Sequence, residues 1–299
     1  MVIRATTEPA LLAEIEAIAG RPGGGSIITA DAAAELVTRY GLASTAELAL
    51  LALPVAGAMA RPPISGFRVA AVGIEAETGD LLLGGNVEFP GSELTTTIHA
   101  EGFVAIRARN RGQTLATLAL PEAHSCAHCR QTLSEAAAAD GLTLIDLAGD
   151  SLTLADLYPW PFRPAALGVT GDTAGLVAWP DLSYVASPPP SEIAASLLDA
   201  GSRAHAPYSG APSAAVLRTA DGQVHATGCV ESVAFNPSFS ALQTALVEVI
   251  AAPQEPAAIV EGWLGATEGG SVDPEPGFRA LLRAIAPNAS AHVARWRLG

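Results

Sequence analysis

The sequence has no lysine, few aromatic residues and few charges. All 16 basic residues are arginine, against 30 acidic residues, so the formal net charge is −14. Proteins that bind nucleic acid through its phosphates need a basic surface, and this balance argues against a nucleic-acid partner. Because 49% of the residues are hydrophobic and only 15% are charged, the chain is too apolar to be disordered. Its 299 residues suffice for about two domains with their own cores.

Long apolar runs and a cysteine framework are also missing. The longest apolar stretch, residues 48–60, is too short to cross a bilayer and contains Pro54. The first residues include Arg4 and Glu8 and lack the apolar segment typical of a signal peptide. Three cysteines cannot form a disulfide framework, and they suit a reducing compartment. We therefore expect a cytoplasmic protein with no membrane contact.

Helical and strand patterns alternate along the chain. The first fifty residues predict three helices: one ends at Gly20, one is capped by Thr29, and one opens with the capping-box pair Ser44 and Glu47. Strand patterns follow at residues 68–74, 80–83, 114–120 and 142–147, and helical patterns at residues 100–109 and 130–139. This alternation predicts an α/β sandwich.

The sequence also repeats itself. The segment Pro63-Ile-Ser65-Gly66 returns as Pro207-Tyr-Ser209-Gly210, displaced by 144 residues. Displaced by 143 residues, Gly79, Gly85, Val87 and Glu88 return as Gly222, Gly228, Val230 and Glu231. The shared displacement predicts two copies of one domain-sized unit.

Together these patterns divide the chain into four expected parts. They are an N-terminal helical segment (1–45), a first copy (46–157), a proline-rich linker (158–190) and a second copy (191–299).

The strongest chemical pattern is His99-Ala100-Glu101 followed by Cys126-Ala-His128-Cys129. One imidazole and two thiolates would give zinc three ligands and leave its fourth position open for water. Glu101 is placed to hold that water without binding the metal. Zinc lowers the pKa of bound water, and this arrangement is the signature of zinc nucleobase deaminases.

Two other interpretations of the Cys-x-x-Cys pair are a closed structural zinc site and a redox dithiol. A closed site needs a fourth ligand, for which His124 and His128 are near enough in sequence. The His-x-Glu pair at its spacing favours the catalytic interpretation.

The metal site is expected in the first copy alone. At a constant displacement of 143 residues, His99, Glu101, Cys126 and Cys129 correspond to Leu242, Thr244, Gly269 and Val272. The second copy would then hold no metal, giving one Zn²⁺ per chain.

A second polar cluster lies in Gly85-Asn86-Val87-Glu88-Phe89. On an extended segment Asn86 and Glu88 point to the same side, where an amide and a carboxylate can bind sugar hydroxyls. Without the metal motif they would be ordinary polar residues at a strand end. Phe67, taken by itself, is expected in the core.

Taken together, the motifs around Ser65, Asn86, His99 and Cys126 resemble those of cytidine deaminase, in its duplicated, homodimeric bacterial form. The resemblance implies an α/β/α sandwich present twice, with a catalytic and a degenerate copy behind a small N-terminal helical segment. It implies that His99, Cys126 and Cys129 bind zinc and that Glu101 moves protons. Phe67, Asn86, Glu88, Ala100 and Phe162 would contact a nucleoside, with Asn86 and Glu88 at the ribose, Phe67 on the pyrimidine and Phe162 closing the pocket.

The implied reaction is hydrolytic deamination of cytidine and deoxycytidine in pyrimidine salvage. Ser125 stands where that family has proline before the first cysteine, and Ala70 stands where it has glycine beside the expected pocket wall. These two differences leave open another aminopyrimidine nucleoside or a nucleoside-like antibiotic as the substrate. A non-catalytic protein with structural zinc is a further alternative.

Overall fold

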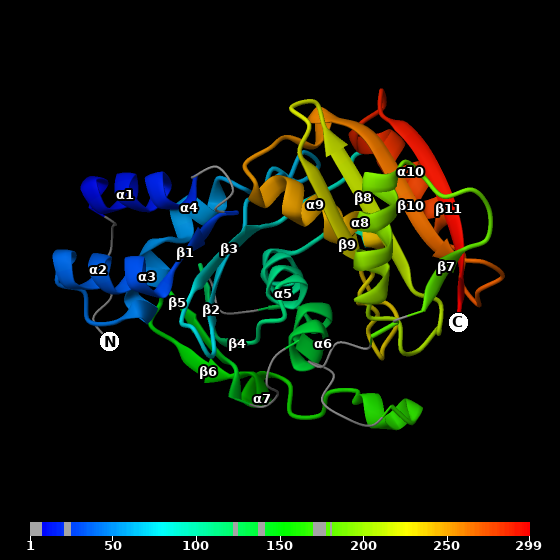
Figure 1. Ribbon diagram of the computed structural model, residues 1–299. Coiled ribbons are helices and arrows are strands. Elements are labelled where there is room, and N and C mark those ends of the chain that lie inside the picture. The colour runs from blue at the N-terminus through cyan, green and yellow to red at the C-terminus, as the bar shows by residue number, and fades with distance from the viewer. Residues whose placement is uncertain (1–7, 21–24, 122–124, 137–140, 170–177, 180) are drawn as a thin grey trace. The chain divides into compact units, whose positions relative to one another are not determined.

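The chain divides into two compact units. The computed structural model describes residues 8–20, 25–121, 125–136, 141–169, 178–179 and 181–299. The first unit comprises Met1–Glu88, Thr97–Pro161 and Ala251–Pro253, and the second comprises Phe89–Thr96, Phe162–Ile250 and Gln254–Gly299. Figure 1 shows the elements of both units with their labels.

The N-terminal helices begin and end where local signals predict. Helix α1 (Pro9–Ala19) ends at Gly20, and α2 (Ala30–Tyr40) ends at Gly41, which adopts a φ of 59°. The Thr29 hydroxyl accepts a hydrogen bond from the N–H of Ala32, as expected of a cap. Helices α3 (Thr45–Leu51) and α4 (Leu53–Gly57) follow.

The predicted capping box at α3 forms in a modified way. The Ser44 hydroxyl accepts from the N–H of Glu47, but the Glu47 carboxylate accepts from the N–H of Ala43 instead of that of Ser44. The cap therefore reaches one residue further back along the chain than the sequence pattern predicts.

The first unit contains a mixed six-stranded sheet in the order β1-β3-β2-β4-β5-β6. Its strands are β1 (Ile27–Ile28), β2 (Ala70–Glu75), β3 (Leu81–Gly85), β4 (Leu115–Leu120), β5 (Thr143–Asp146) and β6 (Ser151–Thr153). Strands β4 and β5 are parallel, and the other neighbours are antiparallel. The helices after β3, β4 and β6 are α5 (Ala100–Asn110), α6 (Ala127–Ala136) and α7 (Leu154–Leu157).

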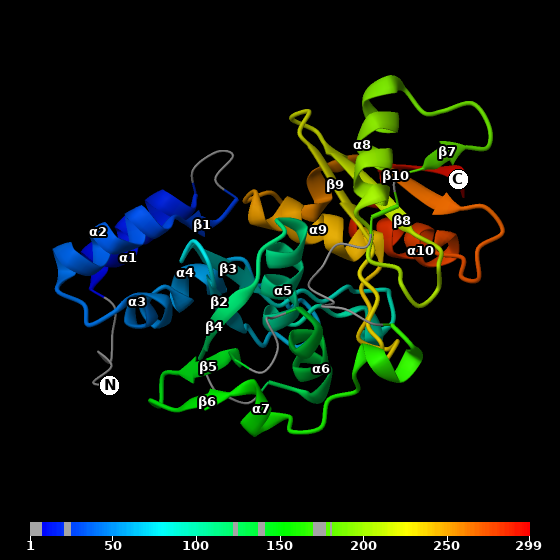
Figure 2. The ribbon, with the colours of Figure 1, turned by 60° about the horizontal axis from the view of Figure 1, so that its bottom comes forward.

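Two adjacent glycines of β3 show that helices cover both faces of this sheet. A side chain on Gly84 would meet Phe103 and Val104 of α5, whereas one on Gly85 would meet the backbone of Ala60 just after α4. Since successive strand residues face opposite sides, α4 and α5 lie on opposite faces. Figures 1 and 2 both show α5 and α6 together on one side of β2 and β3.

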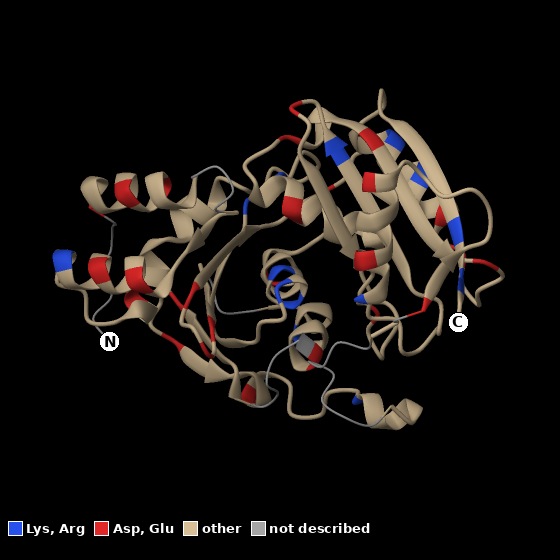
Figure 3. Cartoon of the chain, in the orientation of Figure 1, with Lys and Arg blue, Asp and Glu red and all other residues tan. Residues whose placement is uncertain are grey.

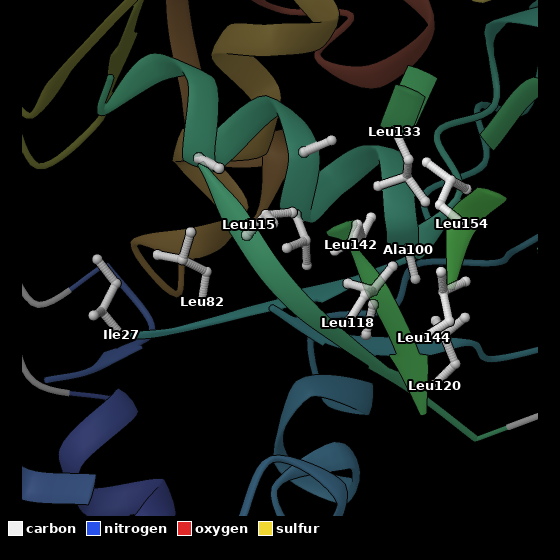
Figure 4. Packing of buried hydrophobic residues seen from close by; sticks show 14 residues of the cluster. Ile27, Leu82, Ala100, Leu115, Leu118, Leu120, Leu133, Leu142, Leu144 and Leu154 are labelled. Carbon is white, nitrogen blue, oxygen red and sulfur yellow. The ribbon is translucent and has the colours of Figure 1, made fainter. Parts of the chain in front are cut away.

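The core beneath α5 and α6 is made mainly of leucine and alanine. Val104 of α5 and Leu133 of α6 pack in one buried cluster with Leu118 and Leu144 of the sheet (Figure 4). Burying these apolar surfaces contributes roughly 25 cal/mol per Å² and fixes both helices on the sheet.

The second unit repeats this plan with a five-stranded sheet in the order β9-β8-β10-β11-β7. Its strands are β7 (Leu182–Tyr184), β8 (Ser213–Thr219), β9 (Val224–Gly228), β10 (Ile259–Thr267) and β11 (Ser290–Leu298), and its helices are α8 (Ser191–Ser202), α9 (Ala241–Ala251, the last residue of which groups with the first unit) and α10 (Glu275–Ile285). Strands β10 and β11 are parallel, as β4 and β5 are. The α/β/α sandwich present twice, expected from the sequence, is therefore the fold.

The two sheets differ in the strand that lies outside the parallel pair. In the first unit the outer strand beside β5 is β6, which follows it in sequence, whereas in the second unit it is β7, which precedes all the others. Strand β7 lies inside residues 158–190, which we predicted to be a linker. That part of the segment is a strand of the second sheet, because it pairs with β11 from Leu182 to Tyr184.

The structure corrects the residue correspondence between the copies. Val87 bridges Ile98, and the equivalent Val230 bridges Phe239, so the loop before the following helix is two residues shorter in the second unit. His99 directly precedes α5, and Ser240 directly precedes α9. His99 therefore corresponds to Ser240, not to Leu242, and Glu101 corresponds to Leu242, not to Thr244.

The same counting applies to the cysteines. Cys126 directly precedes α6 and Pro274 directly precedes α10, so Cys126 and Cys129 correspond to Pro274 and Gly277 instead of Gly269 and Val272. A constant displacement was wrong because the loops differ in length. The corrected positions still offer no imidazole or thiol.

Within the described residues, none of the helices is by itself both long and apolar enough to cross a membrane. Taken together, two helical segments, Ala30–Tyr40 and Thr45–Gly57, would be long and apolar enough, but a sharp bend separates them. Acidic residues are spread over both units, including α1, α2 and α8 (Figure 3).

Gly85→Ala should destabilise the protein by roughly 1–3 kcal/mol, because a Cβ there would lie 2.5 Å from the backbone nitrogen of Ala60. Gly277→Ala is the control: it lies in α10 with open space around it, and should stabilise by about 0.5–1 kcal/mol. Denaturant unfolding measures both. Equal stability of the two variants would contradict the packing we describe.

Candidate active site

The starts of two helices bring one imidazole and two thiols together. His99 is the N-cap residue of α5 and makes no side-chain capping bond, while Cys126 and Cys129 lie just before α6 and in its first turn. The His99 Nδ1 atom lies 3.4 Å from the Cys126 Sγ atom and 3.3 Å from that of Cys129, and the two sulfurs are 3.4 Å apart. The three predicted ligands therefore form one cluster.

This cluster fits a tetrahedral metal ion. Bonds of about 2.0–2.3 Å to one nitrogen and two sulfurs place those atoms about 3.5–3.8 Å apart, close to the observed separations. His128, between the cysteines, is exposed and is not part of the group. His124, the other candidate fourth ligand, lies outside the described residues. The donor set thus provides three ligands suited to zinc.

The protonation of the three ligands is coupled. Hydrogen bonds with Cys129 and His99 lower the pKa of Cys126 to about 3. The hydrogen bond with Cys126, together with burial, raises the pKa of Cys129. The hydrogen bond with Cys126 also raises the pKa of His99. Before a metal binds, Cys126 is a thiolate and Cys129 keeps its proton, so metal binding should release the Cys129 proton.

Glu101 is the second residue of α5 and lies beside this cluster. Its side chain is only 6% exposed, and burial raises the pKa of its carboxyl group. It is not one of the three clustered ligand residues. A buried carboxyl group next to a metal site can accept and return a proton.

A pocket of about 480 Å³ opens over this cluster, a size typical of small-molecule sites. It lies in the first unit. The residues that line it are Ser65, Phe67, Arg68, Val69, Asn86, Glu88, Thr97, His99, Ala100, Glu101, Leu120, Pro121 and Cys126. Of the predicted nucleoside contacts, Phe67, Asn86, Glu88 and Ala100 are therefore gathered around one cavity. Phe162 groups with the second unit and is not among these lining residues.

Asn86 and Glu88 also hold the loops that form the pocket wall. The Asn86 side chain accepts from the N–H of Val69 and donates to the carbonyl of Phe67, both at 2.9 Å. The Glu88 carboxylate accepts from the N–H groups of Ile64 and Ser65 at 2.8 and 2.9 Å, and from the Ser65 hydroxyl at 2.5 Å. Partial burial favours the neutral form of Glu88, but these hydrogen bonds outweigh it and keep its pKa below the ordinary value.

Ser65 is part of the sequence repeat, but the pattern alone gave it no role. The contact between Ser65 and Glu88 has an equivalent in the second unit. There the Glu231 carboxylate accepts from the N–H groups of Tyr208 and Ser209 and from the Ser209 hydroxyl. We call this arrangement the Ser-Glu lock. The joint return of serine and glutamate in the sequence repeat was the signal that could have found it.

The structure also places Phe67, Ala70 and Ser125. Phe67 is 68% exposed, so the expectation that it lies in the core is wrong. Ala70 does not line the pocket; its methyl group lies beside Gly57, at the end of α4. Ser125 is buried, and its hydroxyl accepts from the Arg130 Nε atom at 3.4 Å.

Comparison with known proteins identifies the same kind of domain twice. Residues 44–143 and residues 155–274 each match a model described as "Cytidine and deoxycytidylate deaminase zinc-binding region". The chain is 33% identical over 268 residues to the cytidine deaminase of Sodalis glossinidius, covering 87% of this chain and 86% of that protein. It is 30% identical over 266 residues to the cytidine deaminase of Shewanella sediminis, covering 89% of this chain and 88% of that protein.

Purified protein should contain one zinc per chain, and Cys129→Ala should lose nearly all of it, because an open site has no ligand to spare. His128→Ala, which changes the exposed residue between the cysteines, should keep its zinc. Metal analysis after dialysis measures both. Full zinc in the cysteine variant, or loss in the histidine variant, would show that the ligand set is wrong.

Proposed function

The chain belongs to the cytidine and deoxycytidylate deaminase family, and we propose that it hydrolyses cytidine and deoxycytidine to uridine and deoxyuridine, releasing ammonia. The observation that carries the proposal is the cluster of His99, Cys126 and Cys129 at the edge of a pocket that the buried Glu101 also lines. This arrangement supports an enzyme more than a closed structural zinc site, because His99 and Cys126 of the cluster line a cavity large enough for a nucleoside.

We assign zinc binding to His99, Cys126 and Cys129. Bound there, zinc supplies a Lewis acid that lowers the pKa of water in its open position. Glu101 is the residue that moves protons. One proton must reach the pyrimidine ring nitrogen, and another must reach the departing amine before ammonia can leave. A buried carboxyl group with a raised pKa is suited to both transfers.

We assign ribose binding to Asn86 and Glu88 and stacking on the pyrimidine to Phe67. Asn86 retains one amide N–H and one oxygen lone pair beyond its two loop contacts, since a primary amide has two of each. The exposed ring of Phe67 at the pocket wall is available to a planar ligand. Ala100 would contribute its backbone at the pocket floor.

We also propose that the enzyme is a homodimer that works in the cytoplasm in pyrimidine salvage. Among the described residues, Trp160 is 89% exposed and Phe162 is 43% exposed, which supports a further surface covering them. Phe162 would then close a pocket in the dimer. A reducing compartment suits the two thiol ligands. A monomeric mass for the zinc-loaded protein in sedimentation would overturn the dimer.

Glu101→Gln should retain zinc and bind nucleoside but lose turnover by roughly 10²–10⁴-fold, because the amide keeps the shape but cannot relay a proton. Ammonia release from cytidine, with zinc content measured on the same sample, provides the test. Near-normal turnover would remove Glu101 from the mechanism. A zinc-loaded wild type that released no ammonia from cytidine or deoxycytidine would overturn the proposed function.

Asn86→Ala and Glu88→Gln should weaken cytidine binding by roughly 1–3 kcal/mol, since each removes a partner of a sugar hydroxyl in the pocket. Glu231→Gln is a matched control for Glu88→Gln, because it breaks the equivalent Ser-Glu lock in the second unit. The two glutamine variants should lose similar thermal stability, but only Glu88→Gln should raise KM for cytidine. Equal KM values would assign Glu88 to the lock alone.

A further inference from the structure

Arg130 ties the start of α6 to the end of α7. It is the fourth residue of α6 and follows the metal ligand Cys129. Its Nη1 atom donates to the carbonyl of Leu157 at 2.9 Å, and its Nε atom donates to the hydroxyl of Ser125 at 3.4 Å. All of these residues belong to the first unit. Because the guanidinium group is planar and rigid, the contact with Leu157 restricts where the Nε–H group points.

The Leu157 carbonyl is itself held in place. The Tyr158 hydroxyl, one residue further on, donates to the Gln131 Oε1 atom of α6 at 3.0 Å, and Gln131 is only 3% exposed. Leu154 of α7 and Leu133 of α6 belong to the same buried cluster (Figure 4). The polar contact and the apolar packing together fix α7 on α6, so the guanidinium group has a fixed acceptor.

Ser125 lies directly before the metal ligand Cys126 and is the other end of this connection. It is 3% exposed, and a buried hydroxyl needs a hydrogen-bond partner. Among the described residues, the Nε–H of Arg130 is the one partner of this hydroxyl. On its other side Cys126 is already held, since its carbonyl accepts from the backbone N–H of Arg130 at 3.0 Å. The Ser125 hydroxyl therefore restrains the backbone on the side of Cys126 that lies outside the helix.

The residue type at position 125 gives this contact its importance. The signature of zinc nucleobase deaminases has proline directly before the first cysteine, and a proline ring fixes φ near about −65°. Serine leaves φ free, so the backbone before Cys126 depends on a side-chain contact instead. Among the described residues the Ser125 N–H has no hydrogen-bond acceptor, so a proline here would remove no hydrogen bond. The hydroxyl and the proline ring are thus two ways to restrain the same part of the backbone.

We propose that Ser125 is a positioning residue for the zinc ligand Cys126. Its hydrogen bond with Arg130 restrains the backbone that presents the Cys126 thiolate, as the proline of the signature would. The serine at this position is thereby compatible with an intact metal site. The inference deepens the proposed function and rests on it for the ion that Cys126 would hold.

Ser125→Ala removes the hydroxyl that accepts from Arg130. We expect this variant to release zinc to a chelator about fivefold faster than the wild type, the effect of about one net hydrogen bond. For cytidine, kcat should fall with little change in KM, because the residues assigned to the ribose and the pyrimidine are unchanged. Arg130→Ala should release zinc at least as fast, since it also loses the contact with Leu157. Adding Ser125→Ala to Arg130→Ala should bring no further increase, because the two residues act through one contact.

Two further variants separate positioning from a merely structural role. Ser125→Pro also lacks the hydroxyl but fixes φ, so zinc release should return to within about twofold of the wild-type rate. Ser134→Ala is the matched control, because the buried Ser134 hydroxyl donates to the Gln131 carbonyl at 2.7 Å within the same helix. Its loss should change Tm without changing zinc release.

The proposal is overturned if Ser125→Ala releases zinc at the wild-type rate, or if Ser134→Ala accelerates release equally. It is also overturned if Ser125→Pro releases zinc as fast as Ser125→Ala, because the hydroxyl would then not act by restraining the backbone. A zinc-loaded wild type inactive on cytidine would instead overturn the proposed function, and the zinc-release rates would still decide the role of Ser125.

Discussion

The site depends on one packing constraint: two helices must begin at neighbouring places on the same face of the first sheet. His99 precedes α5, and Cys126 precedes α6, so their ligand atoms approach within 3.4 Å only when both helix starts are held side by side. The leucine and alanine cluster beneath the helices provides that hold. Close packing also explains the adjacent glycines of β3, where a Cβ would collide with helix or backbone on either face.

The duplicated architecture separates interactions that maintain the fold from interactions that belong to one site. The Ser-Glu lock occurs in both units. So does a close glycine contact: Gly85 at the end of β3 approaches the chain after α4, and Gly228 at the end of β9 approaches the chain after α8. The lock therefore has a structural role that needs no metal. Among the described residues, the cluster of His99 with Cys126 and Cys129 has no equivalent in the second unit, where Ser240 and Pro274 stand at the positions of His99 and Cys126. Asn86, which corresponds to Cys229, is likewise confined to the first unit.

The residue directly before the helix has a different role in each unit. The first N–H groups of α5, which follows β3, and of α9, which follows β9, have no partner within the helix and need one from outside it. In the second unit Ser240 provides one through a capping box with Gln243. In the first unit His99 makes no such bond, and its side chain lies with the two thiols instead. Metal binding and helix capping are thus alternative uses of the same place in the fold.

Local signals in the sequence determined the helix caps at Thr29 and Ser44, the alternation of strands and helices, and the choice of His99, Glu101 and the two cysteines. Each depends on residues a few positions apart or on a rare combination of side chains with specific chemistry. Only the tertiary structure decided the exposure of Phe67, the committed hydrogen bonds of Glu88, and the correspondence of His99 with Ser240. Those depend on loop lengths and on contacts between residues far apart in sequence, and a periodic pattern carries no information about either.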